Sequence, residues 1–193
     1  MNFSVILLLL AAVILIGGYV WYASLITRRN DVRAAMGSID VQLRKRFDRL
    51  PNIVALAQKF MTHEKGLLEG LTALRAKVET PYAKDDPKAV EEHLDALRKL
   101  EAGMMQLFAV AENYPELRSA ETVTRAQATF EEVEGNIAAA RRFYNSAVTR
   151  LNNAVEIFPG SIIARLANVQ PFPFYEIEDP AAREPVDVNK LMA

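Results

Sequence analysis

The feature that most constrains this chain is an uncharged, apolar stretch from residue 3 to residue 26. As an α-helix it would extend roughly 36 Å, which is enough to cross the ~30 Å hydrocarbon core of a bilayer with some tilt. Tyr19, Trp21 and Tyr22 lie near its C-terminal end, where aromatic residues favour the membrane interface. The stretch therefore predicts a transmembrane anchor over residues 1–27. Positions that represent the predicted span are Phe3, Leu10, Ile16, Gly17, Gly18, Trp21 and Ile26.

A cleaved signal peptide is the alternative interpretation of this stretch. Signal peptides carry a basic n-region, a shorter apolar run and a cleavage site between small residues. Met1 and Asn2 supply no basic residue, the apolar run is longer, and no A-x-A site follows it. We therefore expect the anchor to be retained.

Basic residues flank the predicted span on one side only. Arg28, Arg29 and Arg33 follow it, and none precedes it. The positive-inside rule then places the N-terminus outside and the bulk of the chain in the cytoplasm. A periplasmic bulk domain is the alternative, because single-span proteins with short N-termini do break the rule.

Composition and motifs argue against several classes of function. The chain has 23 Lys and Arg against 24 Asp and Glu, so no basic surplus indicates nucleic acid as a partner, and it has no cysteine for a disulfide or a thiolate metal site. His63-Glu64 begins like the zinc motif H-E-x-x-H, but Leu67 occupies the second histidine position, and His93 stands alone. No nucleotide-binding loop or nucleophile elbow is present. We therefore predict no catalytic residue, no metal, no cofactor and no enzymatic activity.

A helical stripe of apolar residues follows the predicted span. It recurs every three or four positions from Val32 to Met61, and again from Leu67 to Val78, which is typical of an amphipathic helix. The phase does not change at Pro51. We therefore predict that one helix continues through this proline with a kink, although proline costs about 3 kcal/mol in a helix interior.

Two further helices are predicted beyond residue 80. Asp85 or Asp86 is expected to cap the first of them, and Pro115 ends it. The other has an apolar seam at steps of three and four residues from Val123 to Phe158. Tyr144 lies on this seam, and its hydroxyl is expected to bond to a partner helix.

These patterns predict an all-α protein. An N-terminal transmembrane helix would precede an antiparallel bundle of three long coiled-coil-like helices over residues 28–160. Residues 161–193 are expected to form a short helix and a proline-rich extended tail. The tail is too apolar for solvent because it contains Phe172, Phe174, Tyr175 and Ile177, so it is expected to dock on the bundle or on a neighbouring subunit.

Charged residues near the apolar faces are expected to set the packing of these helices. Asp40, Arg44 and Asp48 are spaced as a charge ladder on one face. Glu134 and Arg141 lie beside the last seam and are expected to pair and fix its register. The basic run over residues 44–49 has two interpretations, contact with anionic lipid or a solvated face that pairs with acidic neighbours.

Several short motifs together resemble signatures of the LemA family. They are DVQLRKRFD at 40–48, LPNIV at 50–54, HEK at 63–65, YPEL at 114–117, EGNI at 134–137, ARRFYN at 140–145 and FP at 158–159. The residues singled out in them are Asp40, Arg44, Asp48, Pro51, Asn52, His63, Glu64, Tyr114, Pro115, Glu134, Arg141, Tyr144, Asn145, Phe158 and Pro159. The similarity runs from about residue 30 to about residue 165. Ala35-Met36-Gly37 stands where the family commonly has a tryptophan, so the chain resembles a divergent member.

The resemblance implies architecture more than chemistry. Family members are bacterial, membrane-anchored helical bundles with a short external N-terminus, which implies the bacterial inner (cytoplasmic) membrane for this chain. They have no established catalytic residues. One expected function is a homo-oligomeric scaffold that organises or remodels the membrane. The kinked membrane-proximal helix, the long apolar seam and the apolar tail are suited to self-association, and a magnetosome protein of the same family implies membrane remodelling. The other is a monomeric adaptor or signalling module that acts with an envelope-stress protease or another membrane protein.

Overall fold

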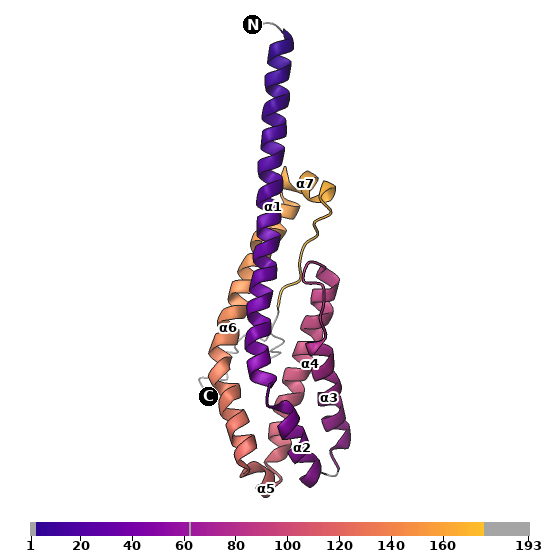
Figure 1. The fold of residues 1–193 in the computed structure, drawn as a ribbon, viewed down its shortest axis with the longest axis vertical. Coiled ribbons are helices and arrows are strands. Elements are labelled where there is room, and N and C mark those ends of the chain that lie inside the picture. The colour runs from indigo at the N-terminus through magenta and orange to yellow at the C-terminus, as the bar shows by residue number, and fades with distance from the viewer. Residues whose placement is uncertain (1–2, 62, 176–193) are drawn as a thin grey trace, which may run out of the picture.

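The computed structural model describes residues 3–61 and 63–175 (Figure 1). Its helices are α1 (Phe3–Phe47), α2 (Leu50–Phe60), α3 (Lys65–Glu79), α4 (Pro87–Ala111), α5 (Pro115–Arg118), α6 (Glu121–Glu156) and α7 (Gly160–Leu166). No strand occurs in this described part of the chain, so the predicted all-α class is confirmed.

α1 is one continuous helix of 45 residues whose two halves have different surroundings. Its N-terminal half stands clear of the other helices (Figure 1), and Leu25 is the first buried residue along it. By length and composition it contains the one candidate membrane span among the described residues, and 0% of that window is buried inside the protein. The predicted apolar segment is therefore helical, and it continues without a break into the bundle.

The helix does not run through Pro51 as predicted. α1 ends at Phe47, and α2 begins at Leu50, so Pro51 lies in the first turn of a new helix. Proline has no N–H to donate to the carbonyl four residues before it, and its φ suits a first turn. A helix end at this point therefore avoids the interior penalty. The apolar phase is kept because Ile53 and Val54 are buried in the same core.

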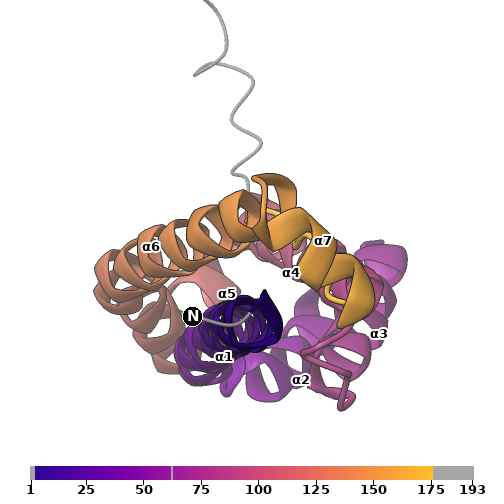
Figure 2. The same ribbon diagram turned by 90° about the horizontal axis from the view of Figure 1, so that it is seen from above.

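Beyond α2 the chain reverses direction three times. α1 and α2 descend in Figure 1, α3 ascends, α4 descends and α6 ascends, so four antiparallel rods pack around one core (Figures 1 and 2). The apolar periodicity predicts three rods, with the first extending to Val78. The chain turns instead between Met61 and Leu67, where no large apolar residue is present to hold a helix against the core.

α4 and α6 follow their predicted signals. Asp86 caps α4 by accepting a hydrogen bond of 3.0 Å from the Lys88 N–H. α6 packs mainly against α1, and its seam from Val123 to Ala154 is buried or half-buried. The seam ends earlier than predicted, because α6 stops at Glu156 and Phe158 is 73% exposed.

The core runs between the four rods. Phe130 of α6 contacts Phe47 of α1 and Phe108 of α4 edge to face, with ring centroids 6.4 and 5.6 Å apart. Pairs of this geometry add about 0.5–1.5 kcal/mol each beyond their burial. The guanidinium of Arg46 lies 3.3 Å from the centroid of the Phe130 ring, so this apolar core also contains a buried charged group.

Candidate functional site

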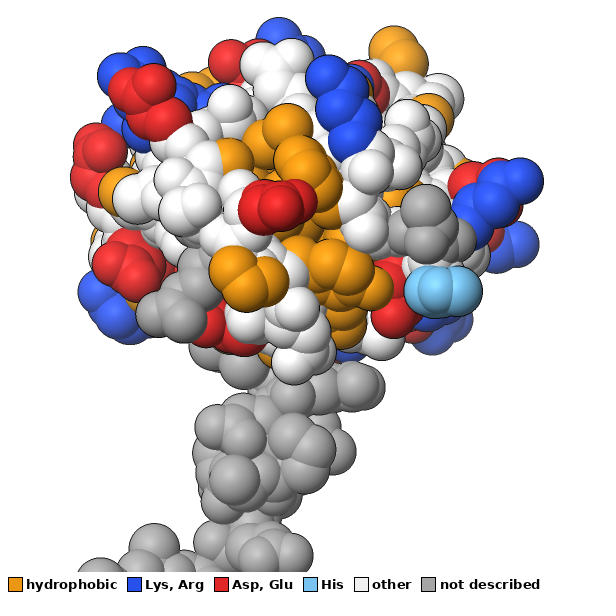
Figure 3. Space-filling view, turned by 90° about the horizontal axis from the view of Figure 1, so that it is seen from below, with side chains coloured by type: hydrophobic (Ala, Val, Ile, Leu, Met, Phe, Trp, Pro, Cys, Tyr) orange, Lys and Arg blue, Asp and Glu red, His pale blue; other side chains and the backbone are white. Residues whose placement is uncertain are grey.

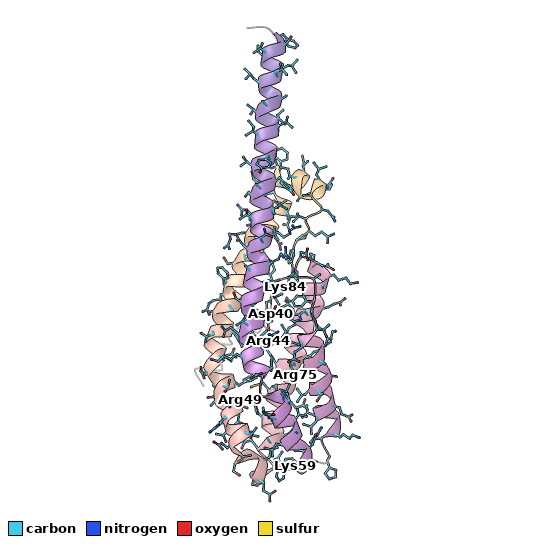
Figure 4. All side chains as sticks on the ribbon, viewed as in Figure 1. Asp40, Arg44, Arg49, Lys59, Arg75 and Lys84 are labelled. Atoms are coloured by element: carbon cyan, nitrogen blue, oxygen red, sulfur yellow. The ribbon has the colours of Figure 1, made fainter. Side chains whose placement is uncertain are left out.

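A cleft with a volume of about 270 Å³ opens between α1, α3 and α4. Figure 4 shows Lys84, Asp40, Arg44 and Arg75 one above another along this side of the bundle. Apolar side chains, among them Leu43, Phe47 and Leu97, form the remaining walls. We call this feature the Asp40 cleft, because the carboxylate of Asp40 lies at the centre of its polar contacts.

Asp40 is engaged from three sides. The Tyr82 hydroxyl donates to its carboxylate at 3.2 Å, and the Lys84 ammonium pairs with it. His93 Nε2 lies 3.3 Å from Asp40 Oδ1, not aligned as a full hydrogen bond, and the His93 ring stacks on Tyr82 with centroids 3.9 Å apart. Burial opposes ionisation, but His93 and Lys84 outweigh it and hold the pKa of Asp40 below its usual 3.8. Burial, together with the Asp40 charge, raises the pKa of Tyr82, so its hydroxyl remains a donor.

The lowered pKa of Asp40 predicts a specific loss of stability in acid. An acid whose folded pKa is depressed stabilises the fold above its unfolded pKa, here 3.8, and that stabilisation is lost as pH falls through the folded pKa. Asp40→Asn lacks this contribution at every pH. We therefore expect the stability difference between the unmodified chain and Asp40→Asn to be largest near pH ~7 and to shrink by about pH 3. Urea unfolding at both pH values measures it, and a difference independent of pH would contradict the assignment.

A second polar group, the Glu101 cluster, is buried between α1, α4 and α6. Glu101 accepts from Arg46 Nη1 at 3.0 Å and from Arg141 Nη2 at 2.6 and 2.7 Å. Glu134 pairs with Arg46 at 2.7 Å, and the Tyr175 hydroxyl accepts from Arg141 at 3.2 Å. The prediction that Glu134 pairs with Arg141 is therefore wrong. Each has its main partner on another helix, which spacing within one helix cannot indicate.

The tail after α7 is held along α6 by two side-chain amides. Asn152 donates to the Phe172 carbonyl at 3.0 Å and accepts from its N–H at 2.8 Å. Asn145 does the same with Tyr175, at 3.1 and 2.8 Å. Tyr144 donates to the Pro173 carbonyl at 2.9 Å, so its partner is the tail and not the predicted neighbouring helix. We call Asn145 and Asn152 the amide clamps.

The prediction that the apolar tail docks on the bundle is confirmed for two of its side chains. Phe172 and Tyr175 are buried on the bundle, whereas Phe174 is 44% exposed. Burial raises the pKa of Tyr175 to about 12, so its hydroxyl stays neutral beside Arg141. The extended tail predicted for residues 176–193 lies outside the described residues.

The predicted charge ladder on α1 does not form. Asp40 is engaged from across the cleft, Arg44 lines the cleft, and Asp48 is exposed in the turn before α2. The basic run over residues 44–49 is not one face either, because Arg46 is buried inside the bundle. Asp40 is paired instead with Tyr82 and Lys84 of the connection between α3 and α4. Arg46 is paired with Glu101 of α4 and Glu134 of α6.

The remaining motif residues lie at the two ends of the bundle. His63 and Glu64 lie in the connection between α2 and α3, and Tyr114 precedes Pro115, the first residue of α5. This end is remote from α7 (Figure 1), and Figure 3 shows hydrophobic side chains gathered at its centre with charged side chains around them. Exposed Asn52 lies in the first turn of α2. Phe158 and Pro159 precede α7 at the opposite end. The structure therefore does not gather the motif residues into one site.

Sequence reasoning missed several residues of these groups. Tyr82, Lys84 and Glu101 lie more than forty positions from their α1 partners, and no periodic signal marks them. The amide clamps could have been found from the sequence, because Asn145 and Asn152 are seven positions apart and therefore share a face of α6. Among the described residues, no three His, Asp or Glu side chains gather as metal ligands would.

Comparison with known proteins agrees with the resemblance seen in the motifs. No curated protein matches the chain. The model of the LemA family matches residues 35–189, which include the lower part of α1, the rest of the bundle, and the tail segment held by the amide clamps. Since this match covers most of the chain, the protein belongs to the LemA family.

Proposed function

We propose that this protein is a membrane-anchored, non-catalytic scaffold that self-associates through the outer face of α1 and α6. The observation that carries the proposal is a pair of exposed apolar side chains on these two helices, Val41 at 65% and Phe143 at 56%. Single exposed apolar residues are common on soluble surfaces, whereas neighbouring ones mark interaction sites. The proposal therefore depends on where the two lie relative to each other.

The register of α1 against α6 places both side chains on one side. Lys45 donates to Glu132 at 3.0 Å across the outer edge of this helix pair. Val41 lies one turn before Lys45, and Phe143 lies three turns after Glu132, so both share the face of that ion pair. In the antiparallel register they are separated by roughly 10 Å along the rods. Other exposed small residues on this face are Ala34, Ser38 and Ala139.

Self-association would turn individual anchors into a cooperative lattice. Copies already held in one membrane plane meet at a high effective concentration, so a modest contact suffices to hold them together. We propose the bacterial inner membrane as the setting, with the bundle on the cytoplasmic side. The Asp40 cleft and the Glu101 cluster are held by partners within the chain, which supports a structural role rather than a catalytic one.

Placing charges on the outer face is expected to dissolve the oligomer. We predict that full-length Val41→Glu/Phe143→Glu is monomeric in mild detergent where the unmodified chain is oligomeric, because like charges that meet across a symmetric interface repel. Met105→Glu is the matched control, since Met105 is 60% exposed but lies on α4. Light scattering gives the masses, also for residues 28–193 alone. An unmodified full-length chain that stays monomeric at high concentration would refute the scaffold.

A monomeric adaptor is the second candidate, and the Asp40 cleft favours it. Its volume of about 270 Å³ admits a side chain of a partner, and Arg44 and Arg75 line its polar part. An acidic residue of a membrane protein, such as an envelope-stress protease, would suit the Arg44 guanidinium, whereas Arg75 is already paired with Glu79 at 2.7 Å. A crosslinked heteromeric band that persists in Val41→Glu/Phe143→Glu would support the adaptor. Loss of that band together with the oligomer would favour the scaffold.

A further inference from the structure

α7 is apolar on two opposite sides. Gly160 and Ala164 are buried against the bundle. On the other side, Ile162 is 53% and Leu166 is 83% exposed, and their spacing of four residues places them on one face. One apolar side of α7 is covered by the bundle, whereas the opposite apolar side is exposed, so a second surface or a lipid phase would be needed to cover it.

The residues just before α7 are also apolar and exposed. Ile157 is 61% and Phe158 is 73% exposed. Together with Ile162 and Leu166 they form what we call the α7 apolar patch. Arg165 and Glu156, which adjoin these residues in the chain, are charged and exposed. An apolar patch rimmed by charged residues is typical of a surface that meets a membrane or a protein.

The position of α7 in the fold identifies which of these the patch meets. α7 lies beside α1 and across the end of the bundle from which the apolar half of α1 emerges (Figures 1 and 2). A Cβ added to Gly160 would lie 3.5 Å from the Trp21 ring, so α7 begins at the level of the aromatic residues of α1. From Phe3 to Tyr22 the helix extends roughly 30 Å, the thickness of a hydrocarbon core. In a bilayer spanned by this segment, α7 lies where the headgroups begin.

Close packing holds the patch in this place. A Cβ at Gly160 would approach the Ala154 carbonyl oxygen to 2.1 Å, so only glycine permits α7 to fold back across the end of α6. Leu25 of α1 is buried at this end of the bundle. The patch is therefore fixed relative to the apolar helix and does not depend on a flexible connection.

We propose that the α7 apolar patch inserts into the interfacial region of the same bilayer that α1 spans. Helices that lie in this region bury their apolar face about 5–10 Å into the boundary between headgroups and acyl chains. Arg165 would then lie among lipid phosphates. A single spanning helix leaves the bundle free to tilt against the membrane plane, and this second contact would restrict that tilt. The inference rests on the membrane anchoring in the proposed function and not on self-association.

The absence of cysteine makes the test direct, because one introduced cysteine carries one label. Full-length Leu166→Cys, Met105→Cys and Ile14→Cys are labelled with the same fluorophore and reconstituted into phosphatidylcholine–phosphatidylglycerol vesicles. Lipids with a nitroxide near the headgroup or along the acyl chain, and iodide in the water, serve as quenchers. We expect headgroup nitroxide to quench the Leu166 label several-fold more than the Met105 label, and iodide to show the reverse order. The Ile14 label reports the span itself.

The other outcomes of the quenching experiment would refute either insertion of the patch or the membrane anchoring. Equal iodide quenching at Leu166 and Met105, without lipid quenching at either, refutes insertion of the patch. Protection of the Leu166 label from both quenchers also refutes it, because another protein surface then covers α7. In both cases lipid quenching at Ile14 leaves the anchoring intact. Absence of lipid quenching at Ile14 refutes the anchoring itself.

Discussion

Glu101→Gln is expected to destabilise the bundle by about 3–5 kcal/mol, a large share of the 5–15 kcal/mol typical of a folded domain. The Glu101 carboxylate is the shared counter-charge of Arg46 and Arg141, whose side chains are only 5% and 9% exposed. Glutamine has nearly the same size, so packing is preserved while the charge is lost. Arg141 would keep its buried positive charge without a carboxylate partner. The midpoint of denaturant unfolding, followed by circular dichroism of the full-length chain in detergent, measures the loss.

Glu134→Gln is the matched control for this prediction. Glu134 pairs with Arg46 in the same cluster, but its side chain is 50% exposed, so we expect a loss of about 1 kcal/mol or less. If Glu101→Gln and Glu134→Gln lowered the free energy of unfolding by similar amounts, burial of the carboxylate would not determine how much each ion pair stabilises the bundle. Replacing Arg46, Glu101 and Arg141 together by apolar residues should restore much of the stability, because no unpaired charge then remains in the core.

Removing the amide clamps is expected to release the tail while the bundle stays folded. Asn145→Ala and Asn152→Ala each leave a buried N–H and carbonyl of the tail unpaired, at a cost of about 1–3 kcal/mol per clamp. The double variant should raise amide exchange at Phe172 and Tyr175 by roughly tenfold for each 1.4 kcal/mol lost. Hydrogen exchange read by mass spectrometry on tail and α4 peptides measures both regions together.

The neighbouring Asn153 provides the control for the clamps. It is exposed on the same helix, so Asn153→Ala should leave exchange in the tail unchanged. Slow exchange of the tail in the double clamp variant would mean that burial of Phe172 and Tyr175 holds the tail without the amides. Equal acceleration in α4 would mean that the tail and the bundle unfold as one unit.

Helical periodicity predicted most of the elements of this fold, and local chemistry predicted several of their ends. The seam of α6 is found where the pattern placed it from Val123 to Ala154, although not as far as Phe158, and Asp86 is the cap of the two candidates Asp85 and Asp86. Pro51 shows the limit of the method, because a stripe that keeps its phase cannot distinguish a kinked helix from two helices joined by a short turn. The reversal after Met61 was marked only by a gap in the stripe. Such a gap predicts weak packing but not the direction that the chain takes next.

The candidate sites were less predictable than the fold, for a physical reason. Asp40 and Arg141 were singled out from the sequence, but Lys84, the partner of Asp40, lies in the connection between α3 and α4, and Glu101, the partner of Arg141, lies on α4. Spacing in sequence reports only neighbours on one helix, whereas buried charges select partners across the core. Tyr144 follows the same rule, since its burial was predicted and its bond to the tail was not.

Because α1 continues from the apolar segment into the bundle, the two parts tilt together as one rigid body. No hinge separates the two parts, because one helix runs from Phe3 to Phe47. The arm below Leu25 reaches roughly 50 Å when α2 is included. In the membrane-spanning arrangement proposed above, a change of ten degrees in tilt, of the kind that a thicker or thinner bilayer imposes, would move the far end of this arm by about 9 Å. The end of the bundle farthest from the membrane would therefore move when the bilayer thickness changes. That movement would occur away from the lipid, where other proteins can contact the bundle.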